Sequence, residues 1–315
     1  MIAEAQRAVL LAASRNSRLR DVVEKAPVTR DLVRRFVAGT GDDHALEVSA
    51  DLRSQGLLVT LDRLGEDVTD EADAEAVRDA YVGLLGRLSA VGLADDGDVE
   101  VSVKLSALGQ ALGSTGESVA LENARVIVEA AALAGTTVTL DMEDHTTVDS
   151  TLRVLEQLRA DHPWVGAVLQ SQLRRTEADC RDLATAGSRV RLCKGAYAPT
   201  DPDAFDVAHE VDRSYVRCLK VLMNGDGYPM VASHDPTLIE IAQALARDVG
   251  REESSWELQM LLGVRPEEQT RLAALGRRMR VYVPFGEDWY AYLVRRLAER
   301  PANLALLLRS LGSRR

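Results

Sequence analysis

The chain has 315 residues, a formal net charge of −11, 46% hydrophobic residues and 28% charged residues. This composition is typical of a globular protein that can bury a large core, and a single α/β barrel can reach this length. General nucleic-acid binding is disfavoured, because it depends on an excess of Lys and Arg against the phosphates. A local basic pocket for an anion stays compatible with the negative total.

The cysteines Cys180, Cys193 and Cys218 are widely spaced and fit neither a disulfide framework nor a zinc site, which favours a reducing compartment. Charged residues interrupt the N-terminus before the short apolar run AVLLAA, so we expect no secretory signal. No uninterrupted apolar stretch of about 18 residues occurs, so we expect no transmembrane helix. We therefore expect a cytoplasmic protein, and peripheral contact with the inner face of the cell membrane stays open.

Residues 1–47 show helical apolar periodicity and predict helices, with Thr29 as an N-cap and a break at 39–43. After this segment, short apolar runs that predict strands alternate with stretches that predict helices. The predicted strands are 57–61, 99–105, 137–142, 165–170, 189–194, 230–233, 256–261 and 280–284. The predicted helices are about 70–92, 117–134, 147–160, 176–186, 204–223, 236–247, 266–276 and 287–299.

Eight strands, each followed by a helix, predict an α/β fold of the (β/α)8 TIM-like barrel type, with N-terminal helices added. The predicted strands are apolar runs rather than strict alternations, as expected where both faces of a parallel sheet are covered. A doubly wound parallel sheet is the alternative. We expect two parts, an N-terminal helical segment at 1–50 and the barrel at 51–315.

The active site of such a barrel lies at the C-terminal ends of its strands. Charged side chains within buried strands are costly unless they are paired or used, so the polar residues that interrupt or end the apolar runs predict a site. These residues are Asp62, Lys104, Asp141, Glu143, Gln170, Gln172, Arg191, Lys194, His234, Asp235, Glu257, Gln259 and Tyr282.

Lys104 and Asp141 lie on neighbouring predicted strands and could pair. The pair is either a structural ion pair or a polar pair at a substrate, with Lys104 attracting a carboxylate. Glu143, Asp144 and His145 suggest a metal site, but no second His follows at ligand spacing, so we expect no metal. His234 is interpreted as a hydrogen-bonded or cofactor-contacting residue.

The turn RLCKGAY (191–197) places a glycine and Lys194 directly after a strand, where backbone N–H groups can hold a phosphate. The chain has no G-x-G-x-x-G and no P-loop, so a Rossmann or P-loop nucleotide site is disfavoured. A dinucleotide would have to bind at the strand ends. Cys193 has no base nearby in the sequence and is interpreted as a core residue.

Arg295 and Arg296 are adjacent on the last predicted helix, so their side chains leave it about 100° apart. Two such arms can hold one small anion, and Arg suits bidentate recognition of a carboxylate. The alternative is a solvated helix face on which Arg295 pairs with Glu299. The sequence pattern alone leaves both interpretations open.

The strand ends and the last helix resemble the proline dehydrogenase family, in its flavin-dependent, monofunctional bacterial form. The resemblance covers about residues 57–303 and involves every predicted strand. The segments that carry it are LDRLGE (61–66), VSVKLSALG (101–109), LDMEDHTTVDSTL (140–152), AVLQSQL (167–173), RVRLCKGAY (189–197), ASHD (232–235), ELQMLLGV (257–264) and RVYVPFGEDWYAYLVRRLAERPAN (280–303).

The resemblance implies a distorted (β/α)8 barrel that binds FAD and oxidises L-proline to Δ1-pyrroline-5-carboxylate. This is the first step of proline catabolism to glutamate, and the electrons pass to a quinone in the membrane. The implied catalytic residues are Asp141, Arg191 and Tyr282. The implied ligands of the proline carboxylate are Lys104, Arg295 and Arg296. The implied flavin contacts are Met142, Gln170, Arg191, Lys194, Gly195, Ala196, Ser233, His234 and Glu299.

By the same resemblance, Asp141 holds Lys104 in place, Tyr282 packs at the proline ring, and Arg191 lies near the flavin N5. No residue is assigned as the base that takes the amine proton. Two other functions are alternatives: a metal-dependent barrel lyase or hydrolase, and a catalytically inactive barrel that acts as a binding module. Measured metal content would identify a metal-dependent lyase or hydrolase. Flavin content would distinguish an inactive binding module from an oxidoreductase.

Overall fold

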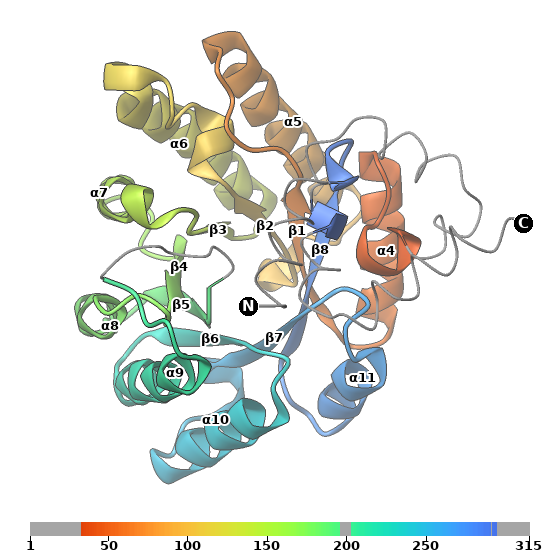
Figure 1. The fold of residues 1–315 in the computed structure, drawn as a ribbon. Helices are drawn as coiled ribbons and strands as arrows, with labels where there is room; N and C mark the ends of the chain where they lie inside the picture. Colours follow the sequence, from red (N-terminus) through yellow and green to blue (C-terminus); the bar gives the residue numbers. More distant parts are fainter. Residues whose placement is uncertain (1–32, 196–202, 291, 295–315) are drawn as a thin grey trace, which may run out of the picture.

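Eight parallel strands close into a barrel in the computed structural model, which describes residues 33–195, 203–290 and 292–294. The strands follow one another around the barrel in chain order, and β8 pairs with β1 to close it (Figure 1). They are β1 Leu58–Arg63, β2 Val99–Val103, β3 Val138–Leu140, β4 Gly166–Gln170, β5 Arg189–Cys193, β6 Tyr228–Ala232, β7 Glu257–Leu261 and β8 Met279–Phe285. The predicted (β/α)8 barrel is confirmed, and the doubly wound alternative is wrong.

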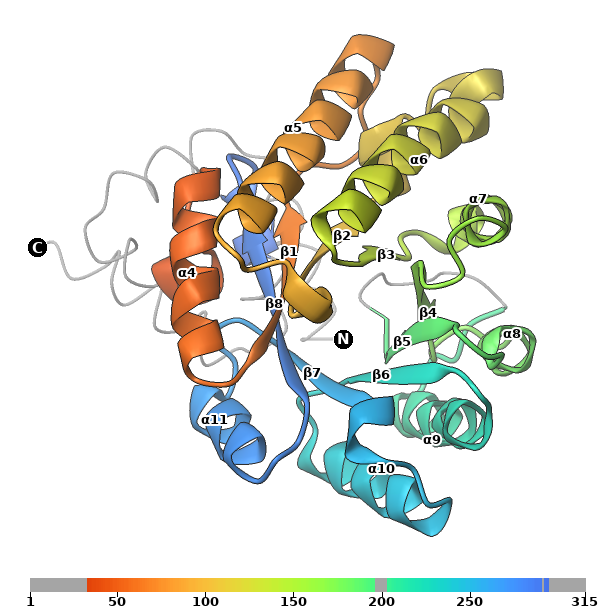
Figure 2. The ribbon, with the colours of Figure 1, turned by 180° about the vertical axis from the view of Figure 1, so that it is seen from behind.

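A ring of α-helices surrounds the strands (Figures 1 and 2). The helices are α4 Asp42–Ser54, α5 Glu71–Ala90, α6 Gly116–Ala134, α7 Val148–Arg159, α8 Thr176–Leu183, α9 Ala208–Asn224, α10 Pro236–Asp248 and α11 Pro266–Ala274. Short 3₁₀ turns are η1 Asp95–Gly97, η2 Leu105–Leu108, η3 Gly113–Thr115, η4 His145–Thr147 and η5 Glu253–Ser255. Side-chain caps fix two starts: Asp70 accepts the N–H of Ala72, and Asp235 accepts that of Thr237.

Helix α4 differs from the sequence prediction, which placed a break at 39–43 and a division between residues 50 and 51. The helix begins at Asp42 and runs across that division, so the two-part organisation stays a prediction. It packs against β1 and β8 and lies between α11 and α5 in the ring (Figure 1). A regular barrel would place there the helix that follows β8.

The chain that follows β8 takes another course. It turns at Gly286, whose φ of +125° is one that glycine adopts readily. The helical residues 289–290 and 292–294 then pack with Leu64 and Val264, which follow β1 and β7. The first turn of this last helix therefore lies at the C-terminal end of the barrel, which accounts for the distortion that the resemblance implied.

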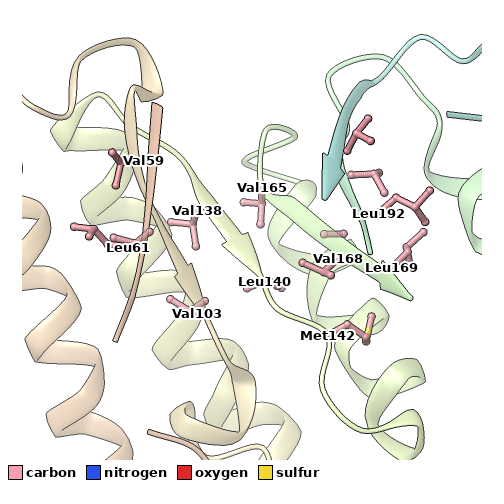
Figure 3. Packing of buried hydrophobic residues seen from close by; sticks show 14 of the residues in the cluster. Val59, Leu61, Val103, Val138, Leu140, Met142, Val165, Val168, Leu169 and Leu192 are labelled. Atoms are coloured by element: carbon pink, nitrogen blue, oxygen red, sulfur yellow. The ribbon is translucent and has the colours of Figure 1, made fainter. Parts of the chain in front are cut away.

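Several strands, β2, β5 and β8 among them, alternate between apolar and polar residues, which corrects the expectation of plain apolar runs there. In β2, Val99, Val101 and Val103 alternate with Glu100 and Ser102, and all five are buried. Successive side chains of a strand point to opposite faces, so the valines face the helices while Glu100 and Ser102 face the barrel interior. Figure 3 shows Val103 among the packed apolar side chains. Polar residues are tolerated inside because they bond to one another.

The barrel interior holds charged side chains that pair across it. Arg189 on β5 donates from Nη2 to Glu100 on β2 at 2.8 Å, although these strands are not neighbours in the sheet. Arg280 donates from Nε to Glu257 at 2.6 Å. Burial raises the pKa of Glu100, but Arg189, Arg280 and Arg191 outweigh it and lower that pKa below its ordinary value. This layer of charged groups lies inside the barrel, directly beneath the residues at the strand ends.

Among the described residues, none of the helices combines the length and the apolar character that a bilayer crossing requires.

Candidate active site

Asp141 collects two hydrogen bonds from the strands that surround it. It directly follows β3, where its backbone N–H donates to the carbonyl of Val103 at 2.8 Å. Arg191 on β5 donates from Nη1 to its Oδ1 at 2.7 Å, and the hydroxyl of Tyr282 on β8 donates to its Oδ2 at 2.7 Å. The three residues predicted to be catalytic therefore meet in one cluster, although they come from distant parts of the sequence.

Lys104 pairs with Asp62, which corrects the predicted contact with Asp141. The Lys104 ammonium lies 2.6 Å from Asp62 Oδ1, and both side chains are buried. Asp62 is on β1, paired in register with Ser102 on β2, so its carboxylate lies on the other side of Lys104 from β3. Burial lowers the pKa of Lys104, but the charges of Asp62 and Asp141 outweigh burial and raise it. Lys104 therefore stays protonated.

Arg191 is a buried guanidinium held on several sides. Its Nε donates to Gln259 Oε1 at 2.6 Å, and Nη1 also donates to Ser102 Oγ at 3.1 Å. Its guanidinium carbon lies 5.2 Å from the centre of the Tyr282 ring, within reach of a cation–π interaction. Burial lowers the pKa of Arg191, but Asp141 and other carboxylates outweigh burial and raise it. The site thus contains a fixed positive charge.

Gln170, a predicted flavin contact, ends β4 and is 3% exposed. Its Nε2 donates to the carbonyls of Met142 and Glu143 at 3.2 and 3.0 Å, which fixes the amide. Its Oε1 is buried and has no partner within the described ranges. Met142, another predicted contact, is also buried. A buried acceptor without a donor is costly, so Gln170 is suited to a ligand that carries an N–H.

The predicted phosphate turn has a shape that requires glycine at position 195. Gly195 has a φ of +113°, and a Cβ added there would lie 2.1 Å from the Gln172 side chain. Lys194 is 2.6 Å from Asp212 and 3.4 Å from Asp235, and it is partly exposed. An anion bound at this turn would have to draw Lys194 from these carboxylates.

Ser233 and His234 follow β6 and are tied to neighbouring backbone. Ser233 Oγ accepts the N–H of Asp235 at 3.1 Å, and His234 Nε2 accepts that of Leu261 at 3.0 Å. This agrees with the interpretation of His234 as a hydrogen-bonded residue. Within the part of the chain that the structure describes, no cluster of His, Cys, Asp or Glu is arranged to hold a metal ion.

Ala196, Arg295, Arg296 and Glu299 lie outside the described residues. Burial raises the pKa of Cys193 to about 11, which keeps it a thiol at neutral pH and agrees with its interpretation as a core residue. Sequence reasoning named Asp62 and Gln259 as strand-end residues without giving either a role. It missed Glu100, although the alternation VEVSVK (99–104) would have indicated one polar face of β2.

A closed parallel barrel with an ionised cluster at its strand ends defines the chain as an enzyme of the (β/α)8 class. A family model described as proline dehydrogenase matches residues 45–307. The chain belongs to the proline dehydrogenase family and is an oxidoreductase.

Two curated relatives have similar lengths. Proline dehydrogenase 1 of Bacillus subtilis subsp. natto is 36% identical over 287 residues, which cover 91% of this chain and 93% of the relative. Proline dehydrogenase of Deinococcus radiodurans is 37% identical over 287 residues, which cover 89% of this chain and 90% of the relative.

The structure is similar to that of proline utilization A (PutA) from Bdellovibrio bacteriovorus inactivated by N-propargylglycine, with a TM-score of 0.78 and 26% identity. The match covers 85% of this chain but 32% of the PutA chain, so this protein spans about a third of that larger one. PutA from Bradyrhizobium japonicum, at a TM-score of 0.72 and 24% identity, shares the fold.

Proposed function

We propose that the protein uses FAD to oxidise L-proline to Δ1-pyrroline-5-carboxylate and passes the electrons to a quinone. The observation that carries the proposal is the cluster of Lys104, Asp141, Arg191 and Tyr282 at the barrel mouth, in a chain whose curated relatives are named proline dehydrogenases. The reaction would be the first step of proline catabolism, and a membrane quinone would require peripheral contact of this protein with the membrane.

Lys104 is suited to bind the carboxylate of a small amino acid. Asp62 takes one of the three N–H donors of its ammonium, and the structure shows no other partner among the described residues. Charge-assisted hydrogen bonds of this kind are stronger than neutral ones, especially in a site shielded from water. We propose that Arg295 and Arg296 complete the carboxylate site.

Two features of the structure fit a flavin. The unpartnered Gln170 Oε1 is a buried acceptor for an N–H on the edge of a ring. Gly195 has a positive φ, and the Gln172 side chain packs where a Cβ would lie, so only glycine keeps the turn after β5 in this shape, and backbone N–H groups of such a turn can hold a phosphate. We propose that Met142, Arg191, Lys194, Ala196, Ser233, His234 and Glu299 complete the cofactor site. When bound, FAD supplies the two-electron oxidant that the side chains lack.

We propose that Asp141, Arg191 and Tyr282 orient the reacting groups and stabilise charge at the site. Asp141 holds both Tyr282 and Arg191, so one carboxylate fixes the phenol and the cation in a common frame. Burial, and then the charge of Asp141, raises the pKa of Tyr282, which keeps the phenol neutral and able to donate. Arg191 keeps its charge in a buried site, where a fixed cation stabilises negative charge that develops during electron transfer.

The test is the visible absorption spectrum of the purified protein. We expect a flavin spectrum, FAD as the flavin released on denaturation, and bleaching when L-proline is added without oxygen. D-proline at the same concentration is the stereochemical control, and a soluble quinone should restore the oxidised spectrum. A protein that takes up no flavin on reconstitution, or whose flavin L-proline does not reduce, would overturn the proposal.

A further inference from the structure

Gln259 lies inside the barrel between two charged groups of opposite sign. It belongs to β7 and is 3% exposed. Its Oε1 accepts from Arg191 Nε at 2.6 Å, and its Nε2 donates to Glu257 Oε1 at 2.6 Å. The side chain thus connects the strand-end cluster to the charged layer beneath it.

The chemistry of its neighbours allows one orientation of the Gln259 amide. A guanidinium has only donors, and an ionised carboxylate has only acceptors, so the amide oxygen must face Arg191 and the nitrogen must face Glu257. Burial raises the pKa of Glu257, but Arg280 outweighs burial and lowers it, so this carboxylate is ionised. No other uncharged side chain of this length offers an acceptor at one edge and a donor at the other.

Glu257 is itself immobilised, which makes Gln259 a rigid support. Arg280 donates to both oxygens of Glu257, from Nε at 2.6 Å and from Nη2 at 3.1 Å. Arg280 also donates to the backbone carbonyls of Val59 and Gly97, so the guanidinium is bound to the barrel frame. The position of Gln259 Oε1 is therefore set by backbone atoms through a short series of hydrogen bonds.

The hydrogen bond from Arg191 to Gln259 helps to fix the plane of the Arg191 guanidinium. Of its five N–H donors, Nε is taken by Gln259, and Nη1 is taken by Ser102 and Asp141. Nη2 makes a longer contact of 3.4 Å with Glu100. One Nη2 donor is left over among the described residues, and it has a fixed direction because the planar group is held at Nε and Nη1.

We propose that Gln259 is a positioning residue for the oxidoreductase reaction: it fixes the plane of Arg191 so that the remaining Nη2 donor and the positive charge face the flavin site. This inference rests on the proposed function, which assigns Arg191 to that site. Gln259 itself touches neither substrate nor cofactor in this role, and it acts through Arg191 alone.

The test replaces Gln259 by Met, which has a similar length and forms neither hydrogen bond. We expect Gln259→Met to retain FAD, to reduce the rate of flavin reduction by L-proline about tenfold or more, and to change KM much less than kcat, because a displacement of about 1 Å can cost 100-fold in rate. We also expect the midpoint potential of the bound flavin to become more negative, as in Arg191→Met, because the cation is no longer held towards it.

A double-mutant cycle separates positioning from general loss of structure. If Gln259 acts through Arg191, the Gln259→Met change has no further effect on reduction rate or midpoint potential in an Arg191→Met background. Gln269→Met is the matched control. Gln269 is 2% exposed and donates to the carbonyls of Leu261 and Val264, so its replacement also removes two buried hydrogen bonds, away from Arg191. It should lower stability and leave kcat within about twofold.

The outcomes are distinct. A wild-type protein whose flavin L-proline does not reduce would overturn the proposed function, and this inference with it. An active wild type with an equally active Gln259→Met variant, an unchanged midpoint potential, or a full additional loss in the Arg191→Met background would overturn the positioning role alone. If Gln259→Met does not fold, Gln259→Asn, which keeps an amide but shortens the side chain, is judged by the same measurements.

Discussion

Replacement of Glu100 by Gln tests whether the charged layer inside the barrel holds the protein together. Glu100 is fully buried and accepts from Thr60 and Thr137 at 2.7 and 2.8 Å in addition to Arg189. Gln has almost the same shape but carries no charge, and one of its two polar atoms becomes a donor. The new N–H donor would face side chains that donate to Glu100 in the wild type. Arg189 would also lose the carboxylate with which it pairs.

The expected loss of stability is large. Removing one partner of a buried ion pair costs about 3–5 kcal/mol, because the remaining charge stays buried without compensation. A typical protein has only about 5–15 kcal/mol of net stability. With the usual unfolding entropy per residue, a loss of this size in a chain of 315 residues lowers Tm by about 5–8 °C.

The assay is urea and thermal unfolding of Glu100→Gln against the wild type. Glu117→Gln is the control, because Glu117 also pairs with an arginine, Arg153, but at the exposed surface, where the loss should be small. An unfolding midpoint for Glu100→Gln no lower than that of the control would refute the reasoning, because removal of the buried charge would then cost no more than removal of an exposed one.

The same pair of proteins has a predictable pH dependence. The folded pKa of Glu100 lies below its ordinary value of 4.5, so its contribution is complete above about that pH and is lost as the pH falls towards the folded pKa. The stability difference between wild type and Glu100→Gln should therefore be constant between about pH 6 and 8 and shrink below about pH 4. A difference that grows in acid would contradict the assigned sign.

Three further substitutions test the site. Lys104→Met should raise KM for L-proline about 10-fold to 100-fold with flavin retained, because the carboxylate loses a charged donor; steady-state kinetics with an unchanged KM would remove Lys104 from the substrate site. Tyr282→Phe removes the hydroxyl that donates to Asp141 and should lower kcat/KM about tenfold, whereas unaltered kinetics would make that bond irrelevant to catalysis. Gly195→Ala should reduce bound FAD per chain, measured by absorbance after dialysis, because its Cβ would overlap Gln172 and distort the turn; full occupancy would argue against a role of this turn in cofactor binding.

The sequence by itself determined the order and type of the elements. Segments rich in apolar residues and bounded by turn residues located each strand to within two residues, although several of these strands also carry buried polar residues on the face that lines the barrel interior. The strand-end rule placed Asp141, Arg191 and Tyr282 among the residues of one rim, and the family resemblance then singled them out before any contact was known. That prediction succeeded because strands that follow in chain order around a closed barrel all end on the same rim.

Tertiary structure decided which side chains pair. Lys104 has acidic residues on the strands at both sides. It pairs with Asp62, while both carboxylate oxygens of Asp141 accept from Arg191 and Tyr282, two residues that come close only when the barrel closes. Arg189 reaches Glu100 because closure of the barrel places β5 across from β2, a relation that no local pattern contains. Sequence periodicity reports which face a residue occupies, whereas the partner of a buried charge depends on distances set when the barrel closes.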